Sequence, residues 1–315
     1  MERIALNRKG WNQRAAEYQR NIGGAAAYGD LVWGPNRFPE SELGILGEVR
    51  GKDVLEVGCG AAQFGIELAK RGARVTGIDL SSEQLRHARR NIRAAGADYR
   101  LERGNAEDLS RFRAGSFDIA VSDFALGFID IERLFPEVAR VLRPGGFCAF
   151  SWASPILDCM TFEGEAPLLR FVRSYFDRKP FVDRGKDPTF EYRRTYGDWV
   201  RAIAAAGLVL EDLIEPQTPR RGTHWDWPQY RWQRTSVVPG TCIWKARKPG
   251  ARARRALDPA RRAFLSSMTG ARARRRQGRS GCGQASRPAG ARPHPRPTRI
   301  WTSSGPRGPA TDTQS

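Results

Sequence analysis

The sequence that decides the fold is Val54-Leu-Glu-Val-Gly-Cys-Gly60, with Gly77-Ile-Asp79-Leu-Ser following it. The first motif is a short apolar run that enters a glycine-rich turn. A turn of this kind lets backbone N–H groups approach a ligand, and the positive end of the next helix favours an anionic group there. The acid that ends the second strand is placed to accept hydrogen bonds from ribose hydroxyls. Together the two motifs predict a site for an adenosine-containing ligand.

The glycine spacing argues against a dinucleotide. That class of ligand is bound by G-x-G-x-x-G, whereas Gly58 and Gly60 are followed by Gln63 at the third position, with the next glycine at Gly65. Glu56 also stands two residues before the first glycine, an unfavourable place for an acid beside a pyrophosphate. A ligand that carries an amino acid's ammonium and carboxylate tolerates this acid far better.

Outward from these motifs, strand-like and helix-like segments alternate, which predicts a parallel, doubly wound α/β sheet. A capping-box pattern at Ser81 and Gln84 opens one helix, which Gly96 closes. After Trp152 the rhythm breaks into a loop-rich, aromatic stretch. The expected strands are 53–57, 74–78, 99–102, 117–122, 146–152, 208–214 and 236–246, and the expected helices are 61–71, 81–96, 131–142 and 195–206.

Five motifs in order resemble the class I S-adenosylmethionine-dependent methyltransferases, above all the group that includes the ubiquinone and menaquinone methyltransferases. They are the E-x-G-x-G run, Asp79, Gly104-Asn-Ala-Glu-Asp-Leu109, Gly115-Ser-Phe-Asp118 and Val141-Leu-Arg-Pro-Gly-Gly146. The resemblance is dense over residues 50–152 and weaker to about residue 248. It implies a Rossmann-like, mostly parallel seven-stranded sheet in a single domain and S-adenosyl-L-methionine as cofactor.

The resemblance also implies roles for the first two motifs. Glu56, Gly58 and Gly60 would line the methionine end of the cofactor. Asp79 would hold the ribose hydroxyls, and Leu80 would lie beside the adenine.

Further along, Asn105 and Ala106 occupy the place where the family usually has Asp-Ala, which reads the adenine amino group. The Asn carbonyl accepts the same proton without the charge. Ser122, at the end of the fourth strand, is expected to face the methionine moiety or the methyl group. Glu107 and Asp108 have a simpler interpretation, as helix-capping or solvent-facing acids.

The sulfonium methyl group is already activated, so the main tasks are to align the nucleophile and to exclude water. The sequence assigns no catalytic residue. Asp123 is a candidate base, with a solvated or helix-capping acid as the alternative, and His224 is a second candidate. There is no Asn/Asp-Pro-Pro-Tyr signature of base N-methylation after the fourth strand.

Two aromatic concentrations lie outside the sheet. One follows the N-terminus, where Trp11 and Tyr18 share a face of an expected helix and Tyr28 and Trp33 follow. The other is His224-Trp-Asp-Trp-Pro228 with Tyr230 and Trp232. Both either pack helices and late strands or roof a pocket for an apolar or aromatic small molecule.

These features define the expected organisation. Residues 1–50 form an N-terminal helical segment that acts as an acceptor lid, and residues 51–248 form the methyltransferase domain, with acceptor-side insertions at 153–193 and 215–235. The tail, 249–315, holds 15 Arg, no Lys and no Glu against two Asp, so it carries +13 of the net charge of +19. Its Arg-, Pro- and Gly-rich composition predicts disorder.

The expected partner is a small-molecule acceptor. Two alternatives stay open: a nucleic-acid methyltransferase that uses the basic tail, and a cofactor-binding protein without transfer activity. The cysteine and histidine spacings support neither a zinc site nor a disulfide framework. No apolar run reaches the length of a membrane span, and no signal-peptide pattern opens the chain, so a cytoplasmic location is expected.

Overall fold

The computed structural model describes residues 2–22, 30–162, 169–218 and 230–250. Its centre is a seven-stranded sheet in the order β12-β13-β7-β6-β3-β4-β5, in which β13 runs antiparallel to both of its neighbours and the other pairs are parallel. The predicted Rossmann-like, mostly parallel sheet is confirmed. The strands are β3 (Asp53–Val57), β4 (Arg74–Asp79), β5 (Tyr99–Arg103), β6 (Phe117–Ser122), β7 (Leu142–Ala153), β12 (Val209–Ile214) and β13 (Thr241–Arg247).

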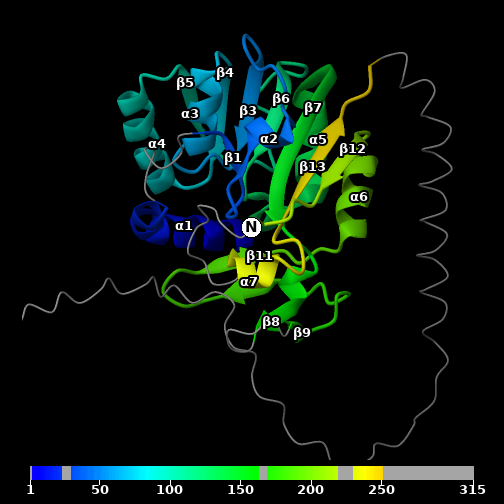
Figure 1. Ribbon diagram of the computed structural model, residues 1–315. Helices are drawn as coiled ribbons and strands as arrows, with labels where there is room; N and C mark the ends of the chain where they lie inside the picture. Colours follow the sequence, from blue (N-terminus) through cyan, green and yellow to red (C-terminus); the bar gives the residue numbers. More distant parts are fainter. Residues whose placement is uncertain (1, 23–29, 163–168, 219–229, 251–315) are drawn as a thin grey trace, which may run out of the picture.

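Helices cover both faces of this sheet (Figure 1). Successive residues of a strand point to opposite faces, so Val54 packs into one core cluster, with residues of α3 and α4, and Leu55 into the other, with residues of α5 and α6. Each face therefore has its own apolar core, as expected for a doubly wound sheet. These helices are α3 (Gln63–Lys70), α4 (Ser82–Ala95), α5 (Ile131–Val141) and α6 (Tyr196–Ala205).

The predicted cap of α4 forms in part. The Ser81 hydroxyl accepts the Gln84 N–H at 3.1 Å, and Gly96 ends the helix in the left-handed conformation. The reciprocal half of a capping box is missing because the Gln84 side chain accepts a hydrogen bond from Gln19 instead. The Ser81 N–H donates to Asp79 at 2.8 Å. The start of α4 is thus tied to the predicted ligand site.

The N-terminal segment is helical only in part. It forms α1 (Glu2–Asn21), a two-stranded hairpin of β1 (Val32–Trp33) and β2 (Phe38–Pro39), and the short helix α2 (Glu40–Leu43). In Figure 1, α1 (dark blue) lies across one end of the sheet rather than on a face. It contacts α4 and β11.

Residues 153–193, which were expected to be loop-rich, contain two small antiparallel hairpins that were not predicted. They are β8 (Met160–Phe162) with β9 (Leu169–Phe171), and β10 (Phe181–Asp183) with β11 (Thr189–Glu191). Each strand has three residues, too few for an alternating pattern to stand out in the sequence. In Figure 1 they lie at the same end of the sheet as α1.

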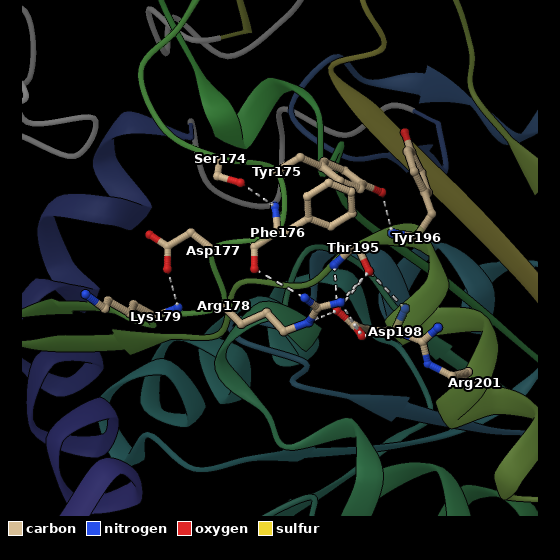
Figure 2. Close-up of polar contacts among 10 residues, drawn as sticks. All are labelled: Ser174, Tyr175, Phe176, Asp177, Arg178, Lys179, Thr195, Tyr196, Asp198 and Arg201. Atoms are coloured by element: carbon tan, nitrogen blue, oxygen red, sulfur yellow. Dashed lines mark hydrogen bonds and ion pairs between the residues drawn. The ribbon is translucent and has the colours of Figure 1, made fainter. Parts of the chain in front are cut away.

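This insertion is fastened to the start of α6 (Figure 2). Thr195 and Asp198 form a capping box, in which the Thr195 hydroxyl accepts the Asp198 N–H and the Asp198 carboxylate accepts the Thr195 N–H. Arg178 and Arg201 both donate to the Asp198 carboxylate. The Tyr175 hydroxyl accepts the N–H of the first helical residue. Burial alone would raise the pKa of Asp198, but these hydrogen bonds lower it to about 2.

Two predicted boundaries were wrong by at least four residues. The last strand begins at Thr241 rather than at residue 236: its pairing with β7 starts with Thr241 opposite Ala153, and a short helix, α7 (Trp232–Thr235), and a turn come before it. β7 begins at Leu142 rather than at Gly146. Residues 143–145, which were expected to form a turn, are part of the strand, and Gly145 and Gly146 pair with Lys248, the residue after β13. There, Gly145 donates to the Lys248 carbonyl at 2.9 Å, and Lys248 donates to the Gly146 carbonyl at 2.8 Å.

Candidate active site

A cavity opens where the parallel strands end. Its floor consists of the loops after β3, β4, β5 and β6, and its roof is α1. Ligands of open α/β sheets bind at this edge. Most of the predicted site lines this cavity, namely Glu56, Gly58, Gly60, Asp79, Leu80, Asn105 and Ala106. The floor also contributes Glu107, Asp123 and Phe124. The roof contributes Ile4, Asn7, Trp11, Tyr18 and Gln19 of α1, together with Ile22, which follows the helix.

The glycine loop needs its glycines for two different reasons. Gly58 has a φ of +68°, and a Cβ there would lie 2.4 Å from the Ala125 Cβ. The Gly58 N–H donates to the Ile78 carbonyl at 2.9 Å, which ties the loop to β4. Gly60 has a φ of +52°, but a Cβ there would meet nothing within 4 Å. Gly58 permits close packing, whereas Gly60 leaves room beside the cavity.

Asp79 is held by the loop that it faces. Its Oδ2 accepts the Gly60 N–H at 2.9 Å, and its Oδ1 accepts the Ser81 N–H at 2.8 Å. Burial raises the pKa of Asp79, although these backbone hydrogen bonds and one from Leu80 oppose the shift. Each carboxylate oxygen has a second lone pair, so the side chain can accept further hydrogen bonds from a ligand in the cavity.

Glu56 is buried at the base of the loop. It accepts hydrogen bonds from the Tyr99 hydroxyl and from the Gly65 N–H. Burial raises the pKa of Glu56 to about 8 despite these partners. A Cβ on Gly65 would lie 2.2 Å from Glu56 Oε2. Glycine at position 65 therefore makes room for the buried Glu56 side chain, and it does not take the place of the third glycine of a pyrophosphate-binding motif.

Asn105, Ala106 and Glu107 also line the cavity. The Asn105 Oδ1 accepts the Glu107 N–H at 3.2 Å, which fixes its side chain and leaves one lone pair. The interpretation of Glu107 as a capping or solvent-facing acid was wrong: its side chain is 2% exposed and is paired with both terminal nitrogens of Arg3, at 2.5 and 2.7 Å. Asp108 is exposed and accepts the Ser110 N–H, as that interpretation expected.

Ser122 is the one member of the predicted set that is not among the residues lining the cavity. It is buried, and its hydroxyl donates to the Val57 carbonyl at 2.8 Å, bridging β6 to β3. Its neighbour Asp123 lines the cavity instead. The Asp123 carboxylate accepts hydrogen bonds from the Gly34 N–H and the Ser151 hydroxyl. It is therefore neither a solvated acid nor a helix cap.

Side-chain amides fasten the roof to the floor. Gln63 donates to Gln19 at 2.5 Å, and Gln19 donates to Gln84 at 2.9 Å, so a chain of amides joins α1 to α3 and α4. Asn12 accepts hydrogen bonds from the Ser81 hydroxyl and the Glu83 N–H. These residues were missed because they meet only in the folded chain.

The predicted aromatic positions divide between core and cavity. Trp11 and Tyr18 line the cavity, with ring centroids 5.4 Å apart, which confirms that they share a helix face. Trp33 instead packs edge-on against Phe64 in the core. Tyr230 contacts Phe124, which lines the cavity, at 5.6 Å between ring centroids. His224 and Tyr28 lie outside the described residues, as does nearly all of the basic tail.

The charge of the cavity suits a cationic ligand. Among the described residues, its lining contains four carboxyl groups, those of Glu56, Asp79, Glu107 and Asp123, and no Lys or Arg. Arg3 neutralises Glu107, and Glu56, with a pKa of about 8, keeps its proton at neutral pH, which leaves Asp79 and Asp123 as the negative groups. A pyrophosphate would be repelled by such a lining, whereas a ligand with an ammonium or sulfonium group would be attracted. The residues present therefore fit S-adenosylmethionine and argue against a dinucleotide.

Within the described part of the chain, no three His, Cys, Asp or Glu residues are grouped in a way that would hold a metal ion. The four cysteines in that part are buried free thiols. No helix there is long and apolar enough to cross a membrane.

A methyltransferase-domain family model matches residues 54–146. The fatty-acid O-methyltransferase of Mycolicibacterium smegmatis is 31% identical over 195 residues, which cover 55% of this chain and 67% of that protein. The ubiquinone biosynthesis O-methyltransferase of Thiobacillus denitrificans is 36% identical over 166 residues, which cover 52% of this chain and 67% of that protein. A crystal structure of an S-adenosylmethionine-dependent methyltransferase from Mesorhizobium loti matches with a TM-score of 0.55 and 26% identity, over 72% of this chain and 99% of that one.

Proposed function

Because the chain belongs to the class I S-adenosylmethionine-dependent methyltransferases, we propose that it transfers a methyl group to a small-molecule acceptor bound beneath α1. The observation that carries this proposal is the acidic cavity that the glycine loop, Asp79 and α1 enclose. Both O-methyltransferase relatives are named for small-molecule chemistry, on a fatty acid and in ubiquinone biosynthesis. They favour this function over methylation of a nucleic acid.

The cofactor would occupy the floor of the cavity. Asp79 would accept hydrogen bonds from the ribose hydroxyls, since its carboxylate is already fixed by two backbone N–H groups. Glu56 and the backbone at Gly58 and Gly60 would hold the methionine end, where the Glu56 carboxyl group would accept a hydrogen bond from the ammonium group, whose charge favours ionisation of the acid. The adenine would lie against Leu80 and Ala106, with the free lone pair of the Asn105 carbonyl as acceptor for its amino group.

When bound, the cofactor supplies an electrophilic methyl group on sulfur. The chain supplies orientation and exclusion of water. Trp11, Tyr18 and Phe128 form an aromatic wall on the same cavity, with Trp11 edge-on to both partners at 5.4 and 5.3 Å. A flat, largely apolar acceptor would lie against these rings.

We propose that α1 is the lid of this site, as the sequence suggested for residues 1–50. It contributes residues to the lining and is held to the floor by the Arg3–Glu107 pair and the Gln19 amide. A cytoplasmic location stays a prediction.

Transfer of radioactivity from S-[methyl-³H]adenosylmethionine to a panel of hydroxylated aromatics, fatty acids, amines and RNA tests the proposal. We expect label in a small-molecule product, and we expect Asp79→Ala to lower the rate of labelling at sub-saturating cofactor. Label in RNA would favour the nucleic-acid alternative, provided that this transfer is lost when the tail, residues 249–315, is removed. Tight cofactor binding without label in any acceptor or in a small-molecule extract of the source cells would favour the non-catalytic alternative.

A further inference from the structure

Asp123 lies at the centre of the site but has no part in holding the cofactor as proposed above. It is the first residue after β6, the strand next to β3. Glu56 of β3 pairs with Val121 of β6, so Asp123 lies at the sheet edge level with Gly58. The cavity at this edge is lined by Asp123 together with Trp11 and Phe128. The carboxylate therefore stands between the proposed methionine end and the aromatic wall.

Only one of its two oxygens accepts hydrogen bonds from the part of the chain that the structure describes. The Gly34 N–H donates to Oδ1 at 2.8 Å, and the Ser151 hydroxyl donates to the same oxygen at 2.5 Å. Oδ2 accepts no hydrogen bond from the described residues, and Asp123 lines the cavity. The side chain is thus fixed through Oδ1, and Oδ2 stays available to a molecule in the cavity.

Strained backbone beside Asp123 supports a functional role. Phe124 has a φ of +56°, an unfavourable conformation for a bulky residue. Its N–H donates to the hydroxyl of the fully buried Ser151 at 3.1 Å. One hydroxyl therefore holds both the strained turn and the acid. Strain of this kind persists where the surrounding structure demands it, often at active sites.

The surroundings select for a neutral acceptor. The described residues that line the cavity offer no Lys or Arg to a carboxylate, and the ionised Asp123 would repel one. A neutral hydroxyl can donate to Oδ2 instead. The titratable groups that interact with Asp123 are Glu56 of β3 and Tyr18 of α1. Burial raises the pKa of Asp123 to about 6, against the hydrogen bonds from Ser151 and Gly34, so the group is ionised at neutral pH.

We propose that Asp123 is the general base of the transfer and that the acceptor presents a neutral phenolic or enolic hydroxyl, an assignment that rests on the proposed function. In the reaction, the acceptor O–H bond breaks and its proton passes to Asp123 Oδ2. The acceptor oxygen forms a bond to the methyl carbon while the bond from that carbon to sulfur breaks, and the bonding electron pair stays on sulfur. The products are a methyl ether, a neutral thioether and a protonated Asp123, which returns its proton to solvent.

A matched pair of probes tests the choice of acceptor. 1-Naphthol and 1-naphthoate have similar aromatic bodies, but only the second carries a negative charge at neutral pH. Binding of each is measured calorimetrically at pH 7.5 on protein saturated with S-adenosylhomocysteine. We expect naphthol to bind at least ~10-fold more tightly than naphthoate. In Asp123→Asn, naphthoate should bind more tightly than it does to the wild type, so that the ratio of the two dissociation constants falls below about threefold. Asp108→Asn, an exposed acid outside the cavity, should leave the ratio unchanged.

A transfer assay with 1-naphthol tests the base itself. We expect Asp123→Asn to lower the rate about 10²–10⁴-fold. The wild-type rate should rise with pH around an apparent pKa of about 6, and this rise should be absent in the variant. Affinity for S-adenosylhomocysteine should change less than about twofold.

The outcomes distinguish a failure of the Asp123 assignment from a failure of the proposed function. Equal binding of the two probes, binding of neither, or an Asp123→Asn variant as active as the wild type would overturn the role of Asp123. A large loss of S-adenosylhomocysteine affinity in that variant would also overturn it, since Asp123 would then serve the cofactor. Failure of the wild type to bind S-adenosylhomocysteine would instead overturn the proposed function.

Discussion

The backbone N–H of Gly60 donates a hydrogen bond to the Asp79 carboxylate at 2.9 Å. This contact joins the glycine loop after β3 to the acid at the end of β4, the two motifs that the sequence assigned separately to one ligand. The loop and the acid therefore hold each other in place before any ligand binds. Such preorganisation lowers the ordering cost of binding.

The two loop glycines should respond differently to alanine. Gly58→Ala would drive a Cβ to 2.4 Å from the Ala125 Cβ, in addition to the strain of a positive φ. Gly60→Ala carries only the strain, about 1–2 kcal/mol, because its Cβ meets open space. We expect Gly58→Ala to lose about 1–3 kcal/mol more in urea unfolding. Equal losses would contradict the packing role of Gly58.

Glu56 should make stability fall as pH rises. Its pKa of about 8 in the folded protein lies above the ordinary value of 4.5, so the folded state keeps a proton that the unfolded state has lost. This contribution is complete below pH 4.5 and disappears as the pH rises through 8. Relative to Glu56→Gln, the wild type should lose at least about 1 kcal/mol of unfolding free energy between pH 5 and 8.5. A parallel pH dependence of the two proteins would exclude this buried, protonated acid.

The Arg3–Glu107 pair should hold α1 on the cavity. Arg3→Ala leaves Glu107 buried without its principal partner, which we expect to destabilise the protein by about 1–3 kcal/mol. Hydrogen exchange of the α1 amides should accelerate. Arg184→Ala is the matched control, because Arg184 pairs with Glu2 of the same helix while both side chains are exposed; it should change stability by less than about 0.5 kcal/mol. Equal effects of the two variants would contradict a clamp at Glu107.

The capping box of α6 should stabilise both the start of that helix and the acceptor-side insertion that contacts it. Thr195→Ala is expected to lower stability by about 1 kcal/mol. Asp198→Asn should lower it further, because Arg178 and Arg201 lose their ionic partner (Figure 2). The contribution of Asp198 should fade as pH falls from 3.8 toward 2. Guanidinium unfolding of both variants at pH 7 measures these effects, and wild-type stability in Asp198→Asn would show that the network is dispensable.

The central sheet could be predicted because its signals are local. Asp53–Val57 and Phe117–Ser122 are apolar runs flanked by breakers, and both form strands over the predicted residues. The three-residue strands beyond residue 153 lack any such pattern, and their hairpins depend on tertiary contacts. The helix expected from residue 61 starts at Gln63, because Ala62 adopts the left-handed conformation at the N-cap.

The residues of the site also differ in whether a local motif or only the folded chain brings them together. Gly58, Gly60 and Asp79 could be predicted to line one cavity because they belong to short local motifs. The Tyr99 hydroxyl that donates to Glu56 is 43 residues away, and the Gln19 amide that accepts from Gln63 is 44 residues away. No local pattern encodes contacts of that separation. Ser122 occupies the expected position in the chain, but its hydroxyl bonds to the neighbouring strand.

The central claim is that the loop after Val57 and the carboxylate of Asp79 together bind one sulfonium nucleoside. Calorimetric titration of the purified protein with S-adenosylmethionine, S-adenosylhomocysteine and NAD⁺ tests it most directly, with Asp79→Ala measured in parallel. We predict that both sulfur nucleosides bind, that NAD⁺ does not, and that Asp79→Ala weakens binding by roughly 1.5–3 kcal/mol. Tight binding of NAD⁺ with no response to the sulfur nucleosides, or an unchanged affinity in Asp79→Ala, would contradict the claim.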